Sequence, residues 1–145
     1  MLQNFIILHV EDNILVQEYL KNLLEDKVKK IYFAKNGQEG LTVYSKIKPD
    51  IVIADIDMPI CDGITMSKEI KKLNKEQYII LLTGCNDEKV LIKAINLGVN
   101  GFISKPIEEK SYFDTLSDAS KVIALRRNLL ELNDIKRGKK SFINE

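Results

Sequence analysis

Acidic side chains follow two of the apolar runs in this sequence, at the points where the runs stop. Residues 51–54 read Ile-Val-Ile-Ala, which is typical of a fully buried strand, and Asp55 comes directly after them. Glu11 and Asp12 follow another apolar run, at residues 5–10, in the same way. A buried strand that ends in an acid places that acid where open α/β sheets bind ligands. We therefore interpret Asp55 as a nucleophile.

Two further polar residues stand at the ends of later apolar runs. Thr83 follows Tyr78-Ile79-Ile80-Leu81-Leu82, and Lys105 follows Gly101-Phe102-Ile103-Ser104. Because the carboxyl ends of parallel strands meet at one edge of a sheet, we expect three acids, a hydroxyl and an ammonium to converge there.

This group of side chains suits the chemistry of phosphate. Three neighbouring carboxylates repel one another, so a divalent cation is the natural counter-charge. Oxygen ligands with vacant positions favour Mg²⁺, which keeps waters and accepts phosphate oxygens. If a phosphoryl group were attached to Asp55, Lys105 could pair with it and Thr83 could donate a hydrogen bond to it. Phosphoryl transfer depends mostly on positioning and charge neutralisation, so the pattern predicts a Mg²⁺-dependent phosphoacceptor.

The elements that must position these residues alternate regularly along the chain. Five predicted strands lie at residues 5–10, 31–34, 51–55, 78–82 and 101–104, and a stretch with helical spacing of apolar residues follows each of them. Such alternation predicts a parallel sheet with helices on both faces. We predict one domain over residues 1–122 and a C-terminal helical extension or linker over residues 123–145. His9, inside the first strand, is expected to be a structural histidine with satisfied ring nitrogens.

Composition narrows the range of functions. The chain has 145 residues, is 45% hydrophobic and carries a net charge of +1, so bulk charge gives no reason to expect contact with nucleic acid or membrane. No apolar run approaches the ~20 residues that span a bilayer. The two cysteines, Cys61 and Cys85, fit neither a metal site nor a disulfide framework. With no signal peptide visible, these features predict a cytoplasmic protein.

Taken together, the motifs resemble the receiver domain of two-component response regulators of the chemotaxis-regulator type. The resemblance covers about residues 4 to 122, and its motifs are Glu11-Asp12, Asp55 with Met58-Pro59 and Asp62-Gly63, Thr83-Gly84, and Phe102-Ile103-Ser104-Lys105-Pro106. It implies a flavodoxin-like (βα)5 fold with strand order 2-1-3-4-5. It also implies that the chain is a phosphoacceptor rather than a turnover enzyme, with a sensor histidine kinase or phosphotransfer protein as its partner.

The resemblance assigns a role to each residue of the set. Asp55 would take the phosphoryl group, and Lys105 and Thr83 would assist. Mg²⁺ would be bound by Asp12, Asp55 and the backbone carbonyl of Asp57, with Glu11 acting indirectly. Thr83 and Phe102 would be the switch pair that alters the face made by the fourth helix, fifth strand and fifth helix. Lys105-Pro106 would form a cis peptide bond.

Three positions depart from the family pattern. Glu11-Asp12 stands where many members have two aspartates. Gly40 stands where alanine is usual in the second helix, which should reduce helix stability. Phe102 replaces the tyrosine of some members and lacks a hydroxyl, so any switch there must work by packing.

Three other functions fit parts of the pattern. Asp55-Ile56-Asp57 resembles the nucleophile motif of haloacid-dehalogenase-type phosphatases, but the order of the other acids differs and the chain has no room for a cap domain. A pseudo-receiver that binds partners without phosphorylation would not need the complete set of acids, hydroxyl and lysine. An electron-transfer flavodoxin would need a phosphate-cradling loop after the first strand, where Glu11-Asp12 would repel FMN.

The apolar residues near the end of the last predicted helix recur at coiled-coil intervals. Val122, Leu125, Leu129 and Leu132 alternate intervals of three and four residues, as in a coiled coil, although over only about two heptads. The spacing predicts a homodimer in which this helix pairs with a second copy. The alternative is a helix that folds back on its own domain. Nothing in the sequence identifies the output domain or effector protein.

Overall fold

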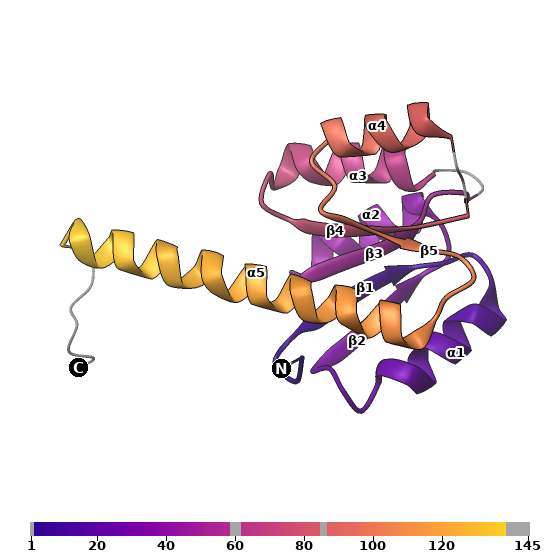
Figure 1. Cartoon of the computed structure of the whole chain (residues 1–145), viewed down its shortest axis with the longest axis horizontal. Coiled ribbons are helices and arrows are strands. Elements are labelled where there is room, and N and C mark those ends of the chain that lie inside the picture. Colours follow the sequence, from indigo (N-terminus) through magenta and orange to yellow (C-terminus); the bar gives the residue numbers. More distant parts are fainter. Residues whose placement is uncertain (1, 59–61, 85–86, 139–145) are drawn as a thin grey trace.

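A computed structural model of the chain contains a parallel sheet covered by helices on both faces. It describes residues 2–58, 62–84 and 87–138; Pro59, Cys61 and Cys85 lie outside the described residues. The five-stranded sheet has the order β2-β1-β3-β4-β5 (Figure 1), which confirms the predicted flavodoxin-like topology. Its strands are β1 (Ile6–Val10), β2 (Lys30–Ala34), β3 (Ile51–Asp55), β4 (Tyr78–Thr83) and β5 (Gly101–Ser104).

The helices divide into two layers. They are α1 (Ile14–Leu24), α2 (Gly37–Lys46), α3 (Gly63–Leu73), α4 (Glu88–Asn96) and α5 (Glu109–Lys136). Buried side chains of α1 and α5 pack with one face of the sheet, and those of α3 and α4 pack with the other face, where α2 also lies (Figure 1). Side-chain oxygens of Asn13, Asn36, Asp62 and Asp87 cap the first four helices by accepting backbone N–H groups.

The central strands explain why their sequences are continuously apolar. Every residue of β3 and β4 is buried, because β3 and β4 have neighbours on both sides and helices cover both faces. Successive side chains alternate between the two cores: Ile51 and Ile53 face α1 and α5, whereas Val52 and Ala54 face α2, α3 and α4. Asp55, at the end of β3, is therefore held in position by a strand that neighbouring strands and helices enclose.

Gly40 supports packing between two helices. A Cβ atom at this position would lie 2.8 Å from the Met66 sulfur and 3.1 Å from a methyl group of Val10. The buried Met66 side chain of α3 therefore occupies the space that an alanine in α2 would need. The glycine lowers helix propensity, and in return α2 can approach Met66 closely.

His9 differs from its predicted state. Its ring is fully buried, and within the described part of the chain neither ring nitrogen has a hydrogen-bond partner. The ring stacks on Phe33 and Tyr112, at centroid distances of 5.9 and 6.4 Å. Burial lowers the pKa of His9 to about 3. Among the described residues, the expectation of satisfied ring nitrogens is wrong, because the ring packs against two aromatic rings rather than beside a hydrogen-bonding group.

The first half of α5 packs as the sequence predicts. Tyr112, Leu116 and Ala119 are fully buried against the sheet. Beyond the domain, the helix projects into solvent (Figure 1). None of the helices in the described part of the chain combines the length and apolar character that a membrane span requires.

Replacing His9 by phenylalanine should remove a pH dependence of stability. Burial lowers the pKa of His9 from its ordinary 6.5 to about 3, so below pH 6.5 the unfolded chain binds a proton that the folded chain does not. The stabilisation is complete above pH 6.5, and the free energy of unfolding should fall by about 1.4 kcal/mol per pH unit as the pH drops towards 3.

Urea unfolding at pH 7 and pH 5 measures this effect. Between the two values, the native chain should lose about 2 kcal/mol more stability than His9→Phe. Tyr112→Phe keeps the histidine and should retain the native pH dependence. Equal losses in the native chain and in His9→Phe would contradict the assignment.

Candidate functional site

Asp55 and Lys105 meet at the carboxyl edge of the sheet. Asp55 ends β3, and its side chain is only 4% exposed. One of its carboxylate oxygens, Oδ2, forms an ion pair with Lys105 Nζ, and the other, Oδ1, accepts the backbone N–H of Asp57 at 3.0 Å. Lys105 follows β5, and its backbone N–H donates to the Thr83 carbonyl at 2.9 Å. The ends of three adjacent parallel strands therefore bring the lysine to the aspartate.

Two more acids lie beside this pair. The carboxylates of Glu11, Asp12 and Asp55 each offer an oxygen within 4.8 Å of the others. Glu11 is buried and Asp12 is exposed. The start of α1 holds Glu11 in place, since Glu11 Oε2 accepts the Asn13 backbone N–H at 3.1 Å and the Gln17 amide donates to the Glu11 carbonyl at 2.6 Å.

The electrostatics of the group suit a bound cation. The pKa of Glu11 is raised to about 7, chiefly by burial and also by a hydrogen bond with Asp12 and the charge of Asp55, whereas the Asn13 N–H and Lys105 act to lower it. A positive charge placed among the three carboxylates would favour the ionised form of Glu11. Oxygen ligands alone, one of them exposed to solvent, fit a hard divalent cation such as Mg²⁺.

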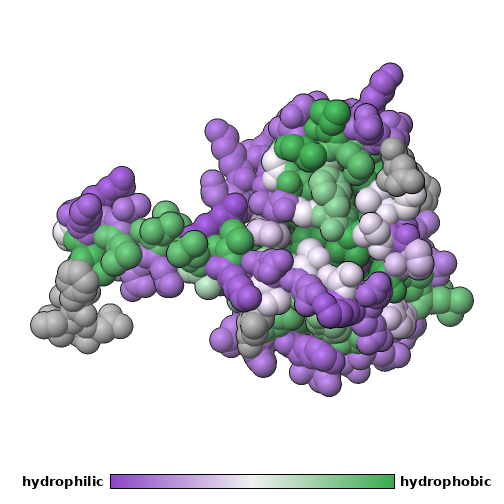
Figure 2. All heavy atoms as spheres, in the orientation of Figure 1, coloured by the Kyte–Doolittle hydropathy of each residue, from purple (hydrophilic) through white to green (hydrophobic). Residues whose placement is uncertain are grey.

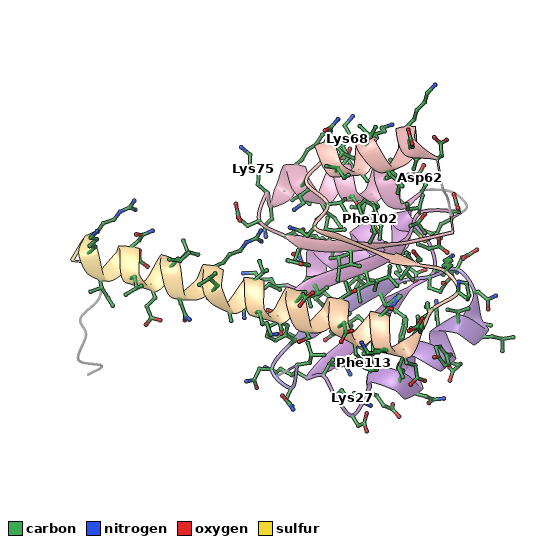
Figure 3. All side chains as sticks on the ribbon, viewed as in Figure 1. Lys27, Asp62, Lys68, Lys75, Phe102 and Phe113 are labelled. Atoms are coloured by element: carbon green, nitrogen blue, oxygen red, sulfur yellow. The ribbon has the colours of Figure 1, made fainter. Side chains whose placement is uncertain are left out.

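Gly63, the first residue of α3, lies against the backbone of Asp55. A Cβ atom here would lie 2.4 Å from the backbone oxygen of Asp55, closer than atoms can approach. The Gly63 N–H donates to the Ile56 carbonyl at 3.0 Å, and Asp62 caps α3 by accepting the Thr65 N–H (Figure 3). The glycine thus lets the N-terminus of α3 contact the backbone of the acid itself.

An open hollow extends from the acids towards α1 and the start of α5. Val16 and Tyr19 of α1 line it, together with Pro106 and Ile107. The peptide bond between Lys105 and Pro106 is cis, as the family resemblance implies. The Tyr19 hydroxyl donates to Glu109 at 3.3 Å and so joins α1 to the first turn of α5. The wall of the hollow next to the acids is therefore partly apolar.

The predicted switch residues lie on neighbouring strands. Thr83 is buried at the end of β4, one residue beyond the level at which Leu82 pairs with Asp55. Phe102 pairs in register with Leu81 and packs, partly buried, against the core beneath α4 (Figure 3). Alternation along β4 directs Leu81 and Thr83 to this same face of the sheet. Thr83 and Phe102 are therefore diagonal neighbours on one face of the sheet.

Sequence reasoning missed the residues that support the acids. No motif in the sequence marks Asn13 as a backbone donor to the Glu11 carboxylate or Gln17 as a side-chain donor to the Glu11 carbonyl. Nothing in the Asp62-Gly63 motif indicates that Gly63 begins α3 and touches the backbone of Asp55.

Comparison with known proteins gives a consistent result. The family model described as the response regulator receiver domain matches residues 7–117. A chemotaxis protein CheY of Halobacterium salinarum is 36% identical over 112 residues, which are 77% of this chain and 93% of that protein. A transcriptional regulatory protein, YdfI of Bacillus subtilis, is 34% identical over 89% of this chain, which spans only 59% of that relative.

A solved structure has the same fold. The signal receiver domain of an HD domain-containing protein from Pseudomonas fluorescens Pf-5 superposes with a TM-score of 0.80 at 27% identity, covering 88% of this chain and 95% of that one.

Replacing Gly63 by alanine should destabilise the fold, because the new methyl group must displace the Asp55 backbone. Overpacking of this kind costs about 1–3 kcal/mol, and chemical denaturation measures it. Gly84→Ala is the matched control near the site, since a Cβ atom there would lie 3.9 Å from the nearest atom, Lys105 Cβ. If the two variants were equally stable, the proposed close contact would be wrong.

Proposed function

The chain belongs to the response regulator receiver domains, the phosphoacceptors of two-component signalling, and on that premise we propose that Asp55 is the residue that accepts the phosphoryl group. The observation that supports this assignment is the ion pair of Asp55 with Lys105, beside two further carboxylates. Family membership supports a phosphoacceptor over the phosphatase and flavodoxin alternatives.

In the proposed reaction, a carboxylate oxygen of Asp55 attacks the phosphorus of a phosphohistidine. A P–O bond forms as the P–N bond breaks, and the leaving imidazole keeps the electron pair and takes up a proton. Lys105, which pairs with the Asp55 carboxylate before transfer, can then pair with a phosphoryl oxygen. The Thr83 hydroxyl would donate to another. The donor is a sensor histidine kinase or a phosphotransfer protein.

We propose that the cation is Mg²⁺ and that Asp12, Asp55 and the backbone carbonyl of Asp57 bind it, with Glu11 acting indirectly. The clustered oxygens and the raised pKa of Glu11 support this proposal. When bound, Mg²⁺ would neutralise the charge of the carboxylates and the incoming phosphate.

The proposed output of the site is a change on the face made by α4, β5 and α5. If Thr83 moves towards a phosphoryl group, it vacates space on the side of the sheet that Phe102 also faces. A packing change of Phe102 would then bias a two-state equilibrium. Phosphorylation at a buried strand end would thereby alter a surface to which a partner protein can bind.

We propose that residues 1–122 form the receiver domain and residues 123–145 an extension or linker. This boundary lies within one residue of Ile123, the last side chain of α5 that is buried within the described residues. The extension would contact an output domain or effector protein, and it is also the segment whose spacing predicts a homodimer.

Asp55→Asn should abolish phosphorylation. Incubation with acetyl phosphate and Mg²⁺, followed by intact-mass measurement, should show one added phosphoryl group on the native chain and none on the variant. Asp57→Asn is the matched control, because only the backbone of Asp57 is assigned to the cation, and it should still be labelled. Chelation of Mg²⁺ should suppress labelling of the native chain. Equal labelling of Asp55→Asn would overturn the assignment.

Lys105→Ala should uncouple the site from the switch. Without the ammonium, a phosphate mimic such as beryllofluoride can still bind, but the response of amide chemical shifts around Phe102 should be blunted severalfold. Lys110→Ala is a suitable control, since this exposed lysine pairs with Asp114 on α5, and it should respond like the native chain. An undiminished response in Lys105→Ala would count against the proposed coupling.

A further inference from the structure

The second half of α5 leaves the domain just after two arginines that fix it there. The Arg126 guanidinium donates to the Glu76 carbonyl at 3.1 Å and lies 5.9 Å from the ring centre of Tyr78. Arg127 pairs with Asp50 and lies 5.7 Å from the ring centre of Phe5. The helix is thus attached up to Arg127, and then projects beyond the sheet (Figure 1).

An outer stripe runs along α5, both over the domain and beyond it. It consists of positions separated by alternating intervals of four and three residues, namely Asp118, Val122, Leu125, Leu129, Leu132 and Lys136. All six side chains are exposed, and the four apolar ones are 38–59% exposed. With 3.6 residues per turn, the stripe lies on the side of α5 opposite the buried Tyr112, Leu116 and Ala119. Figure 2 shows apolar surface along the projecting part.

We propose that the outer stripe binds the outer stripe of a second copy of this chain, with the two helices antiparallel. A heptad pattern of apolar residues is what helix pairing requires, and exposed leucines on a projecting helix call for a covering surface. The stripe covers about 27 Å of helix. With four apolar side chains from each copy, the dimer is weak, forming at micromolar concentrations or above.

The charges at the two ends of the stripe identify the partner and its direction. The stripe begins with an acid, Asp118, and ends with a base, Lys136. When a second copy runs in the opposite direction, Val122 meets Leu132 and Leu125 meets Leu129. In the same register, Asp118 of each copy meets Lys136 of the other. The stripe is therefore complementary to its own reverse, as a two-fold symmetric interface requires.

Parallel pairing would oppose like charges instead. Asp118 would face Asp118, and Lys136 would face Lys136, at the two ends of the stripe. Lys121 and Arg126, which flank the stripe at positions that meet across a parallel pair, would also repel. In the antiparallel pair, Arg126 lies near the symmetry axis, but its guanidinium is directed to the Glu76 carbonyl and the Tyr78 ring of its own domain. Charge thus selects the antiparallel arrangement.

The arrangement also leaves room for both domains. Each domain packs on the face of its own α5 opposite the outer stripe. The two domains then lie on opposite sides of the helix pair and towards opposite ends.

Sedimentation equilibrium of the full chain over a range of concentrations tests the proposal. The native chain should dimerise, and Leu129→Glu should weaken association at least tenfold. Leu130→Glu is the matched control: Leu130 is adjacent and 64% exposed but lies outside the stripe, so association should be retained. A native monomer at every concentration, or equal effects of the two variants, would overturn the proposal.

A charge exchange tests the direction. Asp118→Lys and Lys136→Glu should each weaken association about threefold or more. Each variant places two pairs of like charges opposite each other in the dimer, and the repulsion within each pair should be comparable with that between exposed like charges on a helix. The double variant that combines them should restore native association. A parallel dimer would respond to neither single change nor the combination, since like charges face each other in every case. Failure of the double variant to recover would overturn the antiparallel register.

Discussion

The charge balance at the carboxyl edge of the sheet is the constraint on which the site depends. Three carboxylates, two of them buried, each offer an oxygen within 4.8 Å of the others, and among the described residues Lys105 is the cation that forms an ion pair with one of them. In water such a group would spread apart, but β1 and β3 are paired in register and cannot separate. The strain is electrostatic rather than conformational, and a cation or a change of charge at Asp55 relieves or redistributes it. The fold therefore holds the site in a state that responds to charge.

Much of this arrangement could be predicted from the sequence, because buried parallel strands are apolar throughout and the acids interrupt them visibly. The run at 51–54 fixed the end of β3, and parallel topology then predicted that Asp55 and Lys105 meet, fifty residues apart. The carboxyl ends of parallel strands share one edge of the sheet, so these two residues come together whatever the details of side-chain packing.

Contacts that depend on shape were not predictable in the same way. The approach of Gly63 to the Asp55 backbone and of Gly40 to Met66 depends on distances that spacing alone does not encode. The unpartnered nitrogens of His9 depend on which rings surround it. In α1, Leu15 and Tyr19 have the same helical spacing as Leu20 and Leu24, yet only the latter two are buried, because the two pairs lie on different faces of the helix and only the second pair joins the core.

The helix α5 connects the two ends of the domain. It begins beside the cis peptide of Lys105-Pro106, at the edge that holds the acids, and its last attachment to the domain is at the opposite edge. There Asp50, which also accepts the Ile6 N–H at 2.7 Å, pairs with Arg127. Asp50 directly precedes β3, whose far end is Asp55. One strand, β3, therefore carries the acid at one end and lies directly after the residue that makes the last ion pair of α5 at the other.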